Sequence, residues 1–169
     1  MKINFIPLNF SFHSKPLLVG GKAMEYYGLR SAGADIDLIV TQKDMVKLLQ
    51  QYPTYIKDLF ADLGICVFGF EIWKTICYLS YQDLLAGAID AGDFLVISLE
   101  KLLLLKSFGI HKPKYLEDVR LIVAHLVTRQ NKQAGKIKLI NQDLLKDIPN
   151  IHYIEKKDSQ DIINEGGIL

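Results

Sequence analysis

Short apolar runs alternate with amphipathic segments along the chain, and this pattern predicts its elements. Runs rich in β-branched, aliphatic and aromatic residues, which are typical of strands, lie at residues 16–19, 35–40, 64–78 and 94–97. Helices are expected at residues 22–27, 41–51, 80–88, 98–106 and 113–126. Strands that alternate with helices in this way predict an α/β (α+β) fold, with a mixed central sheet flanked by helices and with C-terminal helices.

Polar residues at segment boundaries indicate where several helices begin. Thr41, followed three residues later by Asp44, forms a capping-box pattern that opens one helix. Ser98 is the expected cap of the helix that ends near Lys106. Pro113 suits the first turn of the last apolar helix. These signals place the starts of three helices.

Other segments are open from the sequence alone. Residues 1–14 fit an edge strand or an arm, residues 54–62 predict one or two helical turns, and residues 64–78 fit either one bent strand or a hairpin. We expect a domain over 1–129 that includes the helices at 99–129, and 130–169 as its polar C-terminal helical extension, with a short helix near 142–146 and a loose tail.

Composition narrows the class of protein. The chain has 169 residues, half of them hydrophobic, and a net charge of +1, which fits one globular domain without a global field for polyanions. No apolar run is long enough to span a membrane, and the N-terminus lacks a signal-peptide pattern. The two cysteines, Cys66 and Cys77, form no metal or disulfide pattern. We therefore expect a cytoplasmic protein without a membrane partner.

Two aspartates one residue apart open the strand at 35–40. Because side chains alternate faces along a strand, Asp35 and Asp37 are expected on one face and Ile36 on the other. Neighbouring carboxylates repel unless a cation lies between them, and a divalent metal is the usual partner. The preceding strand ends in Gly20-Gly21, where the backbone can come close to a phosphate group. Phosphate and metal chemistry are thus predicted together.

The stretch from Leu17 to Val40, L-L-V-G-G-K-A-M-E-Y-Y-G-L-R-S-A-G-A-D-I-D-L-I-V, resembles the nucleotidyltransferase superfamily, which has the polymerase-beta-like fold. Within it, the chain is similar to small bacterial AbiEii-like, toxin-type members, since 99–106 and 112–119 also fit their downstream helix pair. The resemblance covers about residues 16–126. It implies a minimal nucleotidyltransferase fold.

The resemblance also implies roles for individual residues. Gly20 and Gly21 would hold the phosphates of a nucleoside triphosphate. Asp35 and Asp37 would bind two Mg²⁺ ions and act in catalysis together with a third carboxylate. We choose Glu71 as that third acid, because it lies between apolar neighbours on an expected strand, and a site acid needs a rigid element. Its rivals are two aspartates of an expected turn, Asp90 and Asp93.

Basic residues near these positions are candidate phosphate ligands. Lys22 and Arg30 flank the expected short helix, while Lys106 and Lys114 are carried over from the resemblance, with Asp118 as a structural acid of the helix pair. Each basic residue fits a solvated surface position as well. Between 101 and 138 only Glu117 and Asp118 are acidic, against the basic residues Lys101, Lys106, Lys112, Lys114, Arg120, Arg129, Lys132, Lys136 and Lys138. This basic wall would face a triphosphate if it lay beside the aspartates.

The resulting hypothesis is a Mg²⁺-dependent nucleotidyltransferase that moves a nucleoside monophosphate from a nucleoside triphosphate to a hydroxyl. The acceptor would be tRNA, a protein or a small molecule, and the likeness to toxins adds a cognate antitoxin as a partner. The small size of the chain and its apolar helices permit an oligomer. The alternative is a catalytically inactive member of the fold that binds a nucleotide or a partner protein.

Overall fold

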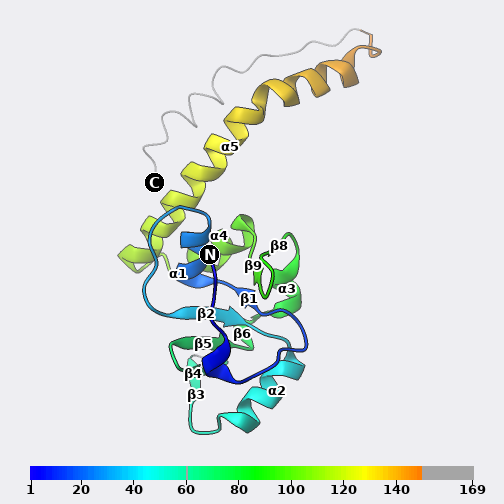
Figure 1. The fold of residues 1–169 in the computed structure, drawn as a ribbon. Coiled ribbons are helices and arrows are strands. Elements are labelled where there is room, and N and C mark those ends of the chain that lie inside the picture. Colours follow the sequence, from blue (N-terminus) through cyan, green and yellow to red (C-terminus); the bar gives the residue numbers. More distant parts are fainter. Residues whose placement is uncertain (60, 150–169) are drawn as a thin grey trace. The chain divides into compact units, whose positions relative to one another are not determined.

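The computed structural model describes residues 1–59 and 61–149, and the chain divides into two units, Met1–Ile122 and Val123–Leu169 (Figure 1). All the buried hydrophobic residues of the described chain belong to the first unit. The division lies N-terminal to the boundary expected at residue 129. The predicted mixed α/β class is confirmed.

The first unit contains a seven-stranded mixed sheet with the strand order β3-β4-β5-β2-β1-β9-β8. Its strands are β1 (Leu17–Leu18), β2 (Ile36–Ile39), β3 (Ile56–Leu59), β4 (Asp62–Val67), β5 (Phe70–Trp73), β8 (Ile89–Asp90) and β9 (Leu95–Val96). Strand β2 runs parallel to β5, and β1 runs parallel to β9, while the other neighbouring pairs are antiparallel. A second, two-stranded sheet joins β6 (Thr75–Ile76) and β7 (Leu79–Ser80).

Three of the predicted helices begin where their caps indicated. The helices are η1 (Ile6–Leu8), α1 (Gly20–Tyr26), α2 (Gln42–Gln51), α3 (Tyr81–Leu85), α4 (Leu99–Ser107) and α5 (Pro113–Leu145). The Thr41 hydroxyl accepts from the Asp44 N–H, and the Ser98 hydroxyl accepts from the Lys101 N–H, so α2 and α4 start as expected. Helix α1 starts at Gly20, two residues earlier than predicted, so both glycines belong to it.

Three open segments take forms that the sequence only partly indicated. Residues 1–14 form an arm with one 3-10 turn, anchored by the buried Leu8 and by a stack of Phe5 on Phe70. The prediction of helical turns at 54–62 was wrong, because β3 pairs there with β4. Residues 64–78 contain a hairpin, in which β4 and β5 are antiparallel across Phe68-Gly69.

The C-terminal prediction was also wrong in part. Helix α5 continues without interruption to Leu145, so no separate short helix exists near 142–146. Strand β8, which contains Asp90, was not predicted at all. The expected loose tail falls largely on 150–169, outside the described residues. Along the described chain we find no helix both long and apolar enough to cross a membrane.

Side chains alternate between the two faces along β2 and β5, so one face carries an apolar row and the other a partly polar row. Leu38 and Ile72 are register partners on β2 and β5, and both are fully buried. The residues that precede them, Asp37 and Glu71, are also register partners and remain half-buried. Because neighbouring positions point to opposite faces, the two carboxylates lie together on the face away from Leu38. The sheet therefore presents an acidic pair across two parallel strands.

Candidate functional site

The acidic pair is the centre of the candidate site. Asp37 and Glu71 lie directly opposite each other on parallel strands, at the start of β2 and β5. The chosen third acid is thus beside Asp37. Asp35 lies just before β2 and is exposed. The rivals lie elsewhere: Asp90 is on β8 at the far edge of the sheet, where it binds Lys15 Nζ at 2.7 Å.

Two glycines bring backbone against the Asp37 carboxylate. Gly20 has φ +63°, and a Cβ atom added to it would lie 1.9 Å from Asp37 Oδ2. The next residue, Gly21, donates its N–H to the Asp37 carboxylate. The Val19 N–H donates to the Asp37 carbonyl at 3.0 Å, which fixes the turn from β1 into α1. Only glycine meets both demands at position 20, namely left-handed backbone and no side chain.

Burial and like charge oppose ionisation of Asp37. Desolvation raises the pKa of the Asp37 carboxyl, and the charge of Glu71 raises it further. The Gly21 N–H and the Lys106 ammonium lower the pKa of Asp37 but do not cancel the rise, to which Asp35 also adds. The carboxylate is therefore destabilised in the free protein, and an added cation would relieve that cost.

A buried ion-pair cluster joins three elements around Asp118. Asp118 on α5 is 1% exposed and accepts from Arg30 Nη2 at 2.9 Å and from Lys106 Nζ at 2.7 Å. Burial by itself would raise the pKa of the Asp118 carboxyl, but the hydrogen bonds from Arg30 and Lys106 outweigh burial and hold it below its usual value. Arg30, a candidate phosphate ligand, pairs with Asp118 through two of its nitrogens, and its contact with a phosphate stays a prediction.

Lys106 links this cluster to the acidic pair. Its side chain is 7% exposed, and its ammonium lies 4.7 Å from the centre of the Tyr115 ring. The same charge acts on the carboxylate of Asp37. Burial raises the pKa of the Tyr115 hydroxyl, and the charges of Asp37 and Asp118 raise it further. Asp118 and Tyr115 therefore hold a buried cation beside the carboxylates.

Of the remaining predicted phosphate ligands, Lys22 is partly buried and Lys114 is exposed. Lys22 Nζ lies 3.0 Å from Glu25 Oε2, three residues along α1. Lys114 is exposed at the start of α5. Asp93 is exposed in the turn between β8 and β9. The structure thus brings Glu71, Lys106 and the two glycines to Asp37, and leaves Lys114 and Asp93 on the surface.

Sequence reasoning missed three neighbours of the acidic pair. Tyr115 was read only as part of a helix, Lys57 lies where helical turns were expected, and Cys66 lies on a strand whose pairing was left open. Cys66 is the register partner of Glu71, and Lys57 Nζ lies 3.7 Å from Glu71 Oε1. Burial raises the pKa of the Cys66 thiol, with a further contribution from Glu71. A hairpin turn at Phe68-Gly69 would have predicted that Cys66 opposes Glu71.

The donor set fits a divalent cation in part. Two facing carboxylates, one destabilised by the other, are the oxygen ligands that Mg²⁺ prefers. However, the described residues contain no group of three or more His, Cys, Asp and Glu side chains arranged to hold a metal ion. Asp37 and Glu71 thus form a two-carboxylate site, and the binding of two ions stays a prediction.

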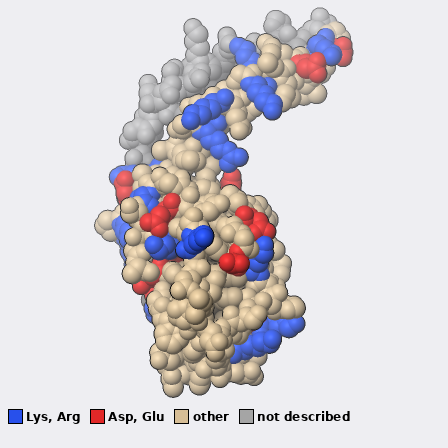
Figure 2. All heavy atoms as spheres, in the orientation of Figure 1, with Lys and Arg blue, Asp and Glu red and all other residues tan. Residues whose placement is uncertain are grey.

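The predicted basic wall is divided between the two units. Lys101, Lys106 and Arg120 belong to the first unit, whereas the basic residues Arg129, Lys132, Lys136 and Lys138 are exposed on α5 in the second. Figure 2 shows blue side chains gathered along this part of α5. Of the basic-wall residues, Lys106 is the one whose charge acts on Asp37.

We compared the chain with models of protein families, with curated proteins and with solved structures. None of the three comparisons gives a match. The functional argument therefore depends on the geometry of the site.

Proposed function

We propose that this protein is a Mg²⁺-dependent nucleotidyltransferase that transfers a nucleoside monophosphate from a nucleoside triphosphate to a hydroxyl acceptor. One observation carries the proposal: Asp37 and Glu71 lie side by side on parallel strands, and the Gly20-Gly21 backbone lies against Asp37. Paired carboxylates beside a closely packed glycine backbone suit a metal-bound phosphate.

In the proposed reaction, the acceptor hydroxyl oxygen forms a bond to the α-phosphorus. The bond from that phosphorus to the β-phosphate oxygen breaks, pyrophosphate leaves, and the hydroxyl proton passes to a carboxylate of the pair. Mg²⁺ held by Asp37 and Glu71, with Asp35 beside them, would neutralise phosphate charge and lower the pKa of the attacking hydroxyl. Gly20 places side-chain-free backbone against Asp37, and contacts of Gly20 and Gly21 with the phosphates stay predictions.

Lys106 supplies positive charge within the same site. Its ammonium is held by Asp118, and its charge already acts on Asp37. Since Lys106 is buried and Asp37 is half-buried, this charge is screened less than that of a surface lysine. Lys106 would therefore stabilise negative charge that develops on the phosphates. Contacts of Lys22, Arg30 and Lys114 with phosphate stay predictions.

The proposed class of acceptor is based on the resemblance to toxin-type members rather than on the geometry of the site. tRNA or a protein hydroxyl is the leading acceptor class, with a small molecule as the other, and a cognate antitoxin is the expected partner. Incubating the protein with each radiolabelled nucleoside triphosphate, Mg²⁺ and separate RNA, protein and metabolite fractions would identify the labelled class.

Two carboxylate variants test the enzyme reading. Asp37→Asn and Glu71→Gln should each lower label transfer and pyrophosphate release by about 100-fold or more, because each removes a charge placed to bind the metal. Asp90→Asn is the matched control, since Asp90 is an exposed aspartate at the far edge of the sheet. Circular dichroism would verify that all three variants are folded. Unchanged transfer by Asp37→Asn would contradict the proposal.

A second candidate is a nucleotide-binding protein without catalytic activity. It is favoured by the exposure of Asp35 and by the absence of a three-ligand metal group among the described residues. Calorimetric titration with each nucleoside triphosphate and Mg²⁺ separates the two candidates. Binding without pyrophosphate release in any acceptor fraction would favour the second.

A further inference from the structure

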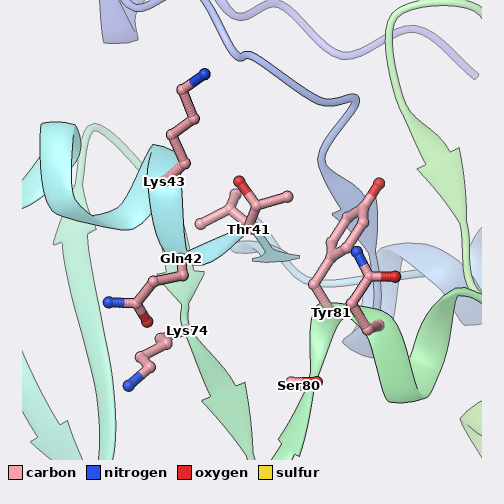
Figure 3. Close-up of a pocket in the computed structure, with 8 residues that line it drawn as sticks. Thr41, Gln42, Lys43, Lys74, Ser80 and Tyr81 are labelled. Atoms are coloured by element: carbon pink, nitrogen blue, oxygen red, sulfur yellow. The ribbon is translucent and has the colours of Figure 1, made fainter.

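A cavity of about 370 Å³ lies at the other ends of the two central parallel strands. Asp37 and Glu71 lie near the start of β2 and β5, whereas the cavity is lined by residues that follow their ends. The lining residues are Val40, Thr41, Gln42, Lys43, Lys74, Ser80, Tyr81 and Gln82 (Figure 3). About 10 Å of strand separates the two places, given a rise of about 3.3 Å per residue. The cavity is therefore distinct from the acidic pair.

The hydroxyl groups around the cavity are already engaged. The Thr41 hydroxyl donates to Asp44 Oδ2 at 2.8 Å, and the Ser80 hydroxyl donates to Asp83 Oδ2 at 2.6 Å. The Tyr81 hydroxyl donates to the Lys15 carbonyl at 2.9 Å. These bonds fix the walls of the cavity. The side chains left to meet a ligand are amides and ammonium groups.

Those remaining groups are mainly donors. Gln42 and Lys74 extend to the same side of the cavity in Figure 3, one from α2 and the other from the end of β5, with Tyr81 across from them. Lys43 extends away toward His13, whose Nε2 lies 3.3 Å from its Nζ. Gln82 adds a second amide. The Lys74 ammonium and two amides thus remain at a space large enough for a small metabolite.

The lining residues include no carboxylate, and the two acids bonded to them, Asp44 and Asp83, are already engaged. Asp44 is fully buried and accepts from the His13 N–H at 2.7 Å, the Ser14 N–H at 3.3 Å and the Thr41 hydroxyl. The Asp44 carboxylate is thus already hydrogen-bonded to the N-terminal arm and to the cap of α2. The lysine charge at the cavity is available to a ligand.

The first turn of α2 adds backbone donors to these side chains. The N–H groups of Gln42 and Lys43 precede the hydrogen-bond ladder of this ten-residue helix, and its positive dipole end lies at the cavity wall. Lysine binds phosphate as a point charge, and Lys74 supplies that charge at the cavity. We propose that this cavity binds the phosphate group of a small phosphorylated metabolite, for which ribose 5-phosphate serves as the probe.

Titration of the full-length chain with ribose 5-phosphate, inorganic phosphate and uncharged ribose tests the proposal. Divalent cations are removed with a chelator, so that no metal-dependent nucleotide site contributes. Ribose 5-phosphate should bind, and Lys74→Gln should weaken that binding about tenfold, the effect expected for losing one charge-assisted hydrogen bond. Lys43→Gln should weaken binding less, because its ammonium is directed to His13. Ribose should bind at least tenfold more weakly than its phosphate.

Lys47→Gln is the matched control, since Lys47 is an exposed lysine of the same helix outside the cavity lining. It and Asp37→Asn should bind ribose 5-phosphate as the natural chain does, which separates this site from the proposed catalytic one. Equal loss in Lys47→Gln, undiminished binding by Lys74→Gln, or equal binding of ribose and ribose 5-phosphate would each overturn the proposal.

Discussion

Asp118 shows how burial decides the value of an ion pair in this protein. Its bond to Lys106 and the bond between Asp143 and Lys146 are both 2.7 Å long. The side chains of the first pair are almost completely buried, whereas those of Lys146 and Asp143 are 60% and 75% exposed to solvent. A buried cation that loses its counter-ion is strongly destabilised, while an exposed one is solvated by water.

We expect Asp118→Asn to lower the free energy of unfolding by about 3 kcal/mol, because Lys106 and Arg30 would lose their shared carboxylate. Urea unfolding at neutral pH measures the change. Asp143→Asn is the control and should change the free energy of unfolding by less than about 0.5 kcal/mol. The pKa of Asp118 is lowered, so its contribution is present above the unfolded pKa and lost as pH falls through the folded pKa. Equal, small effects of both variants would contradict this assignment.

At the scale of elements, the start of α1 is the tightest junction with the site. Gly20 combines φ +63° with a clash between any added Cβ and Asp37, whereas Gly28 has φ +68° and nothing within 4 Å of such an atom. Gly21 has neither constraint, because its nearest neighbour would be Ala32 Cβ at 3.8 Å. Comparing variants of the three glycines therefore separates the effect of left-handed backbone from the effect of the close approach to Asp37.

Gly20→Ala should both destabilise the fold and abolish transfer, because the methyl group displaces the Asp37 carboxylate. Gly28→Ala should lose about 1 to 2 kcal/mol of stability from its left-handed backbone but keep activity. Gly21→Ala should change both stability and label transfer only slightly. Thermal melts and label-transfer rates of the three variants test this order. Full activity of folded Gly20→Ala would show that the approach to Asp37 is not needed.

The elements that the sequence predicted well carry local signals. Thr41 and Ser98 cap helices through their own hydroxyls, and apolar runs mark β1 and β2. The strand at 56–59 could not be predicted, because it depends on antiparallel pairing with β4 rather than on its own periodicity. Helix α5 continues past Gly135 because a single exposed glycine costs only about 1 kcal/mol in a helix.

The site residues that lie on predicted strands could be predicted from the sequence, whereas those joined by long-range contacts could not. Glu71 could be chosen because alternation and rigidity favour an acid on a strand, and its register with Asp37 follows from parallel pairing. The partner of Arg30 could not be predicted, since Asp118 is 88 residues away and reaches it only through the packing of α5. Long-range ion pairs leave no periodic signal in a sequence.

For the molecule as a whole, the acidic pair is a cost to stability. The pKa of Asp37 is raised, so the folded state holds its proton more tightly than the unfolded chain does. Between the unfolded pKa of about 3.9 and the folded pKa, stability from this group therefore falls as pH rises, and it stays low above the folded pKa.

Asp37→Asn should accordingly raise the free energy of unfolding at neutral pH, by an amount on the order of 0.5 kcal/mol for a like-charged cross-strand pair. The gain should shrink as pH falls toward 4, where the natural carboxyl becomes neutral as well. Urea unfolding at several pH values measures this trend. Asp90→Asn should not gain, because Lys15 lowers the pKa of Asp90. A loss of stability in Asp37→Asn at neutral pH would contradict the direction of the Asp37 shift.

The repulsion between Asp37 and Glu71 also makes the chain a reporter of its own ligands. A cation that joins the two carboxylates binds the folded chain alone and raises the melting temperature in proportion to the logarithm of its concentration above Kd. Panels of divalent cations with each nucleoside triphosphate can therefore be ranked by melting temperature, before any acceptor is identified.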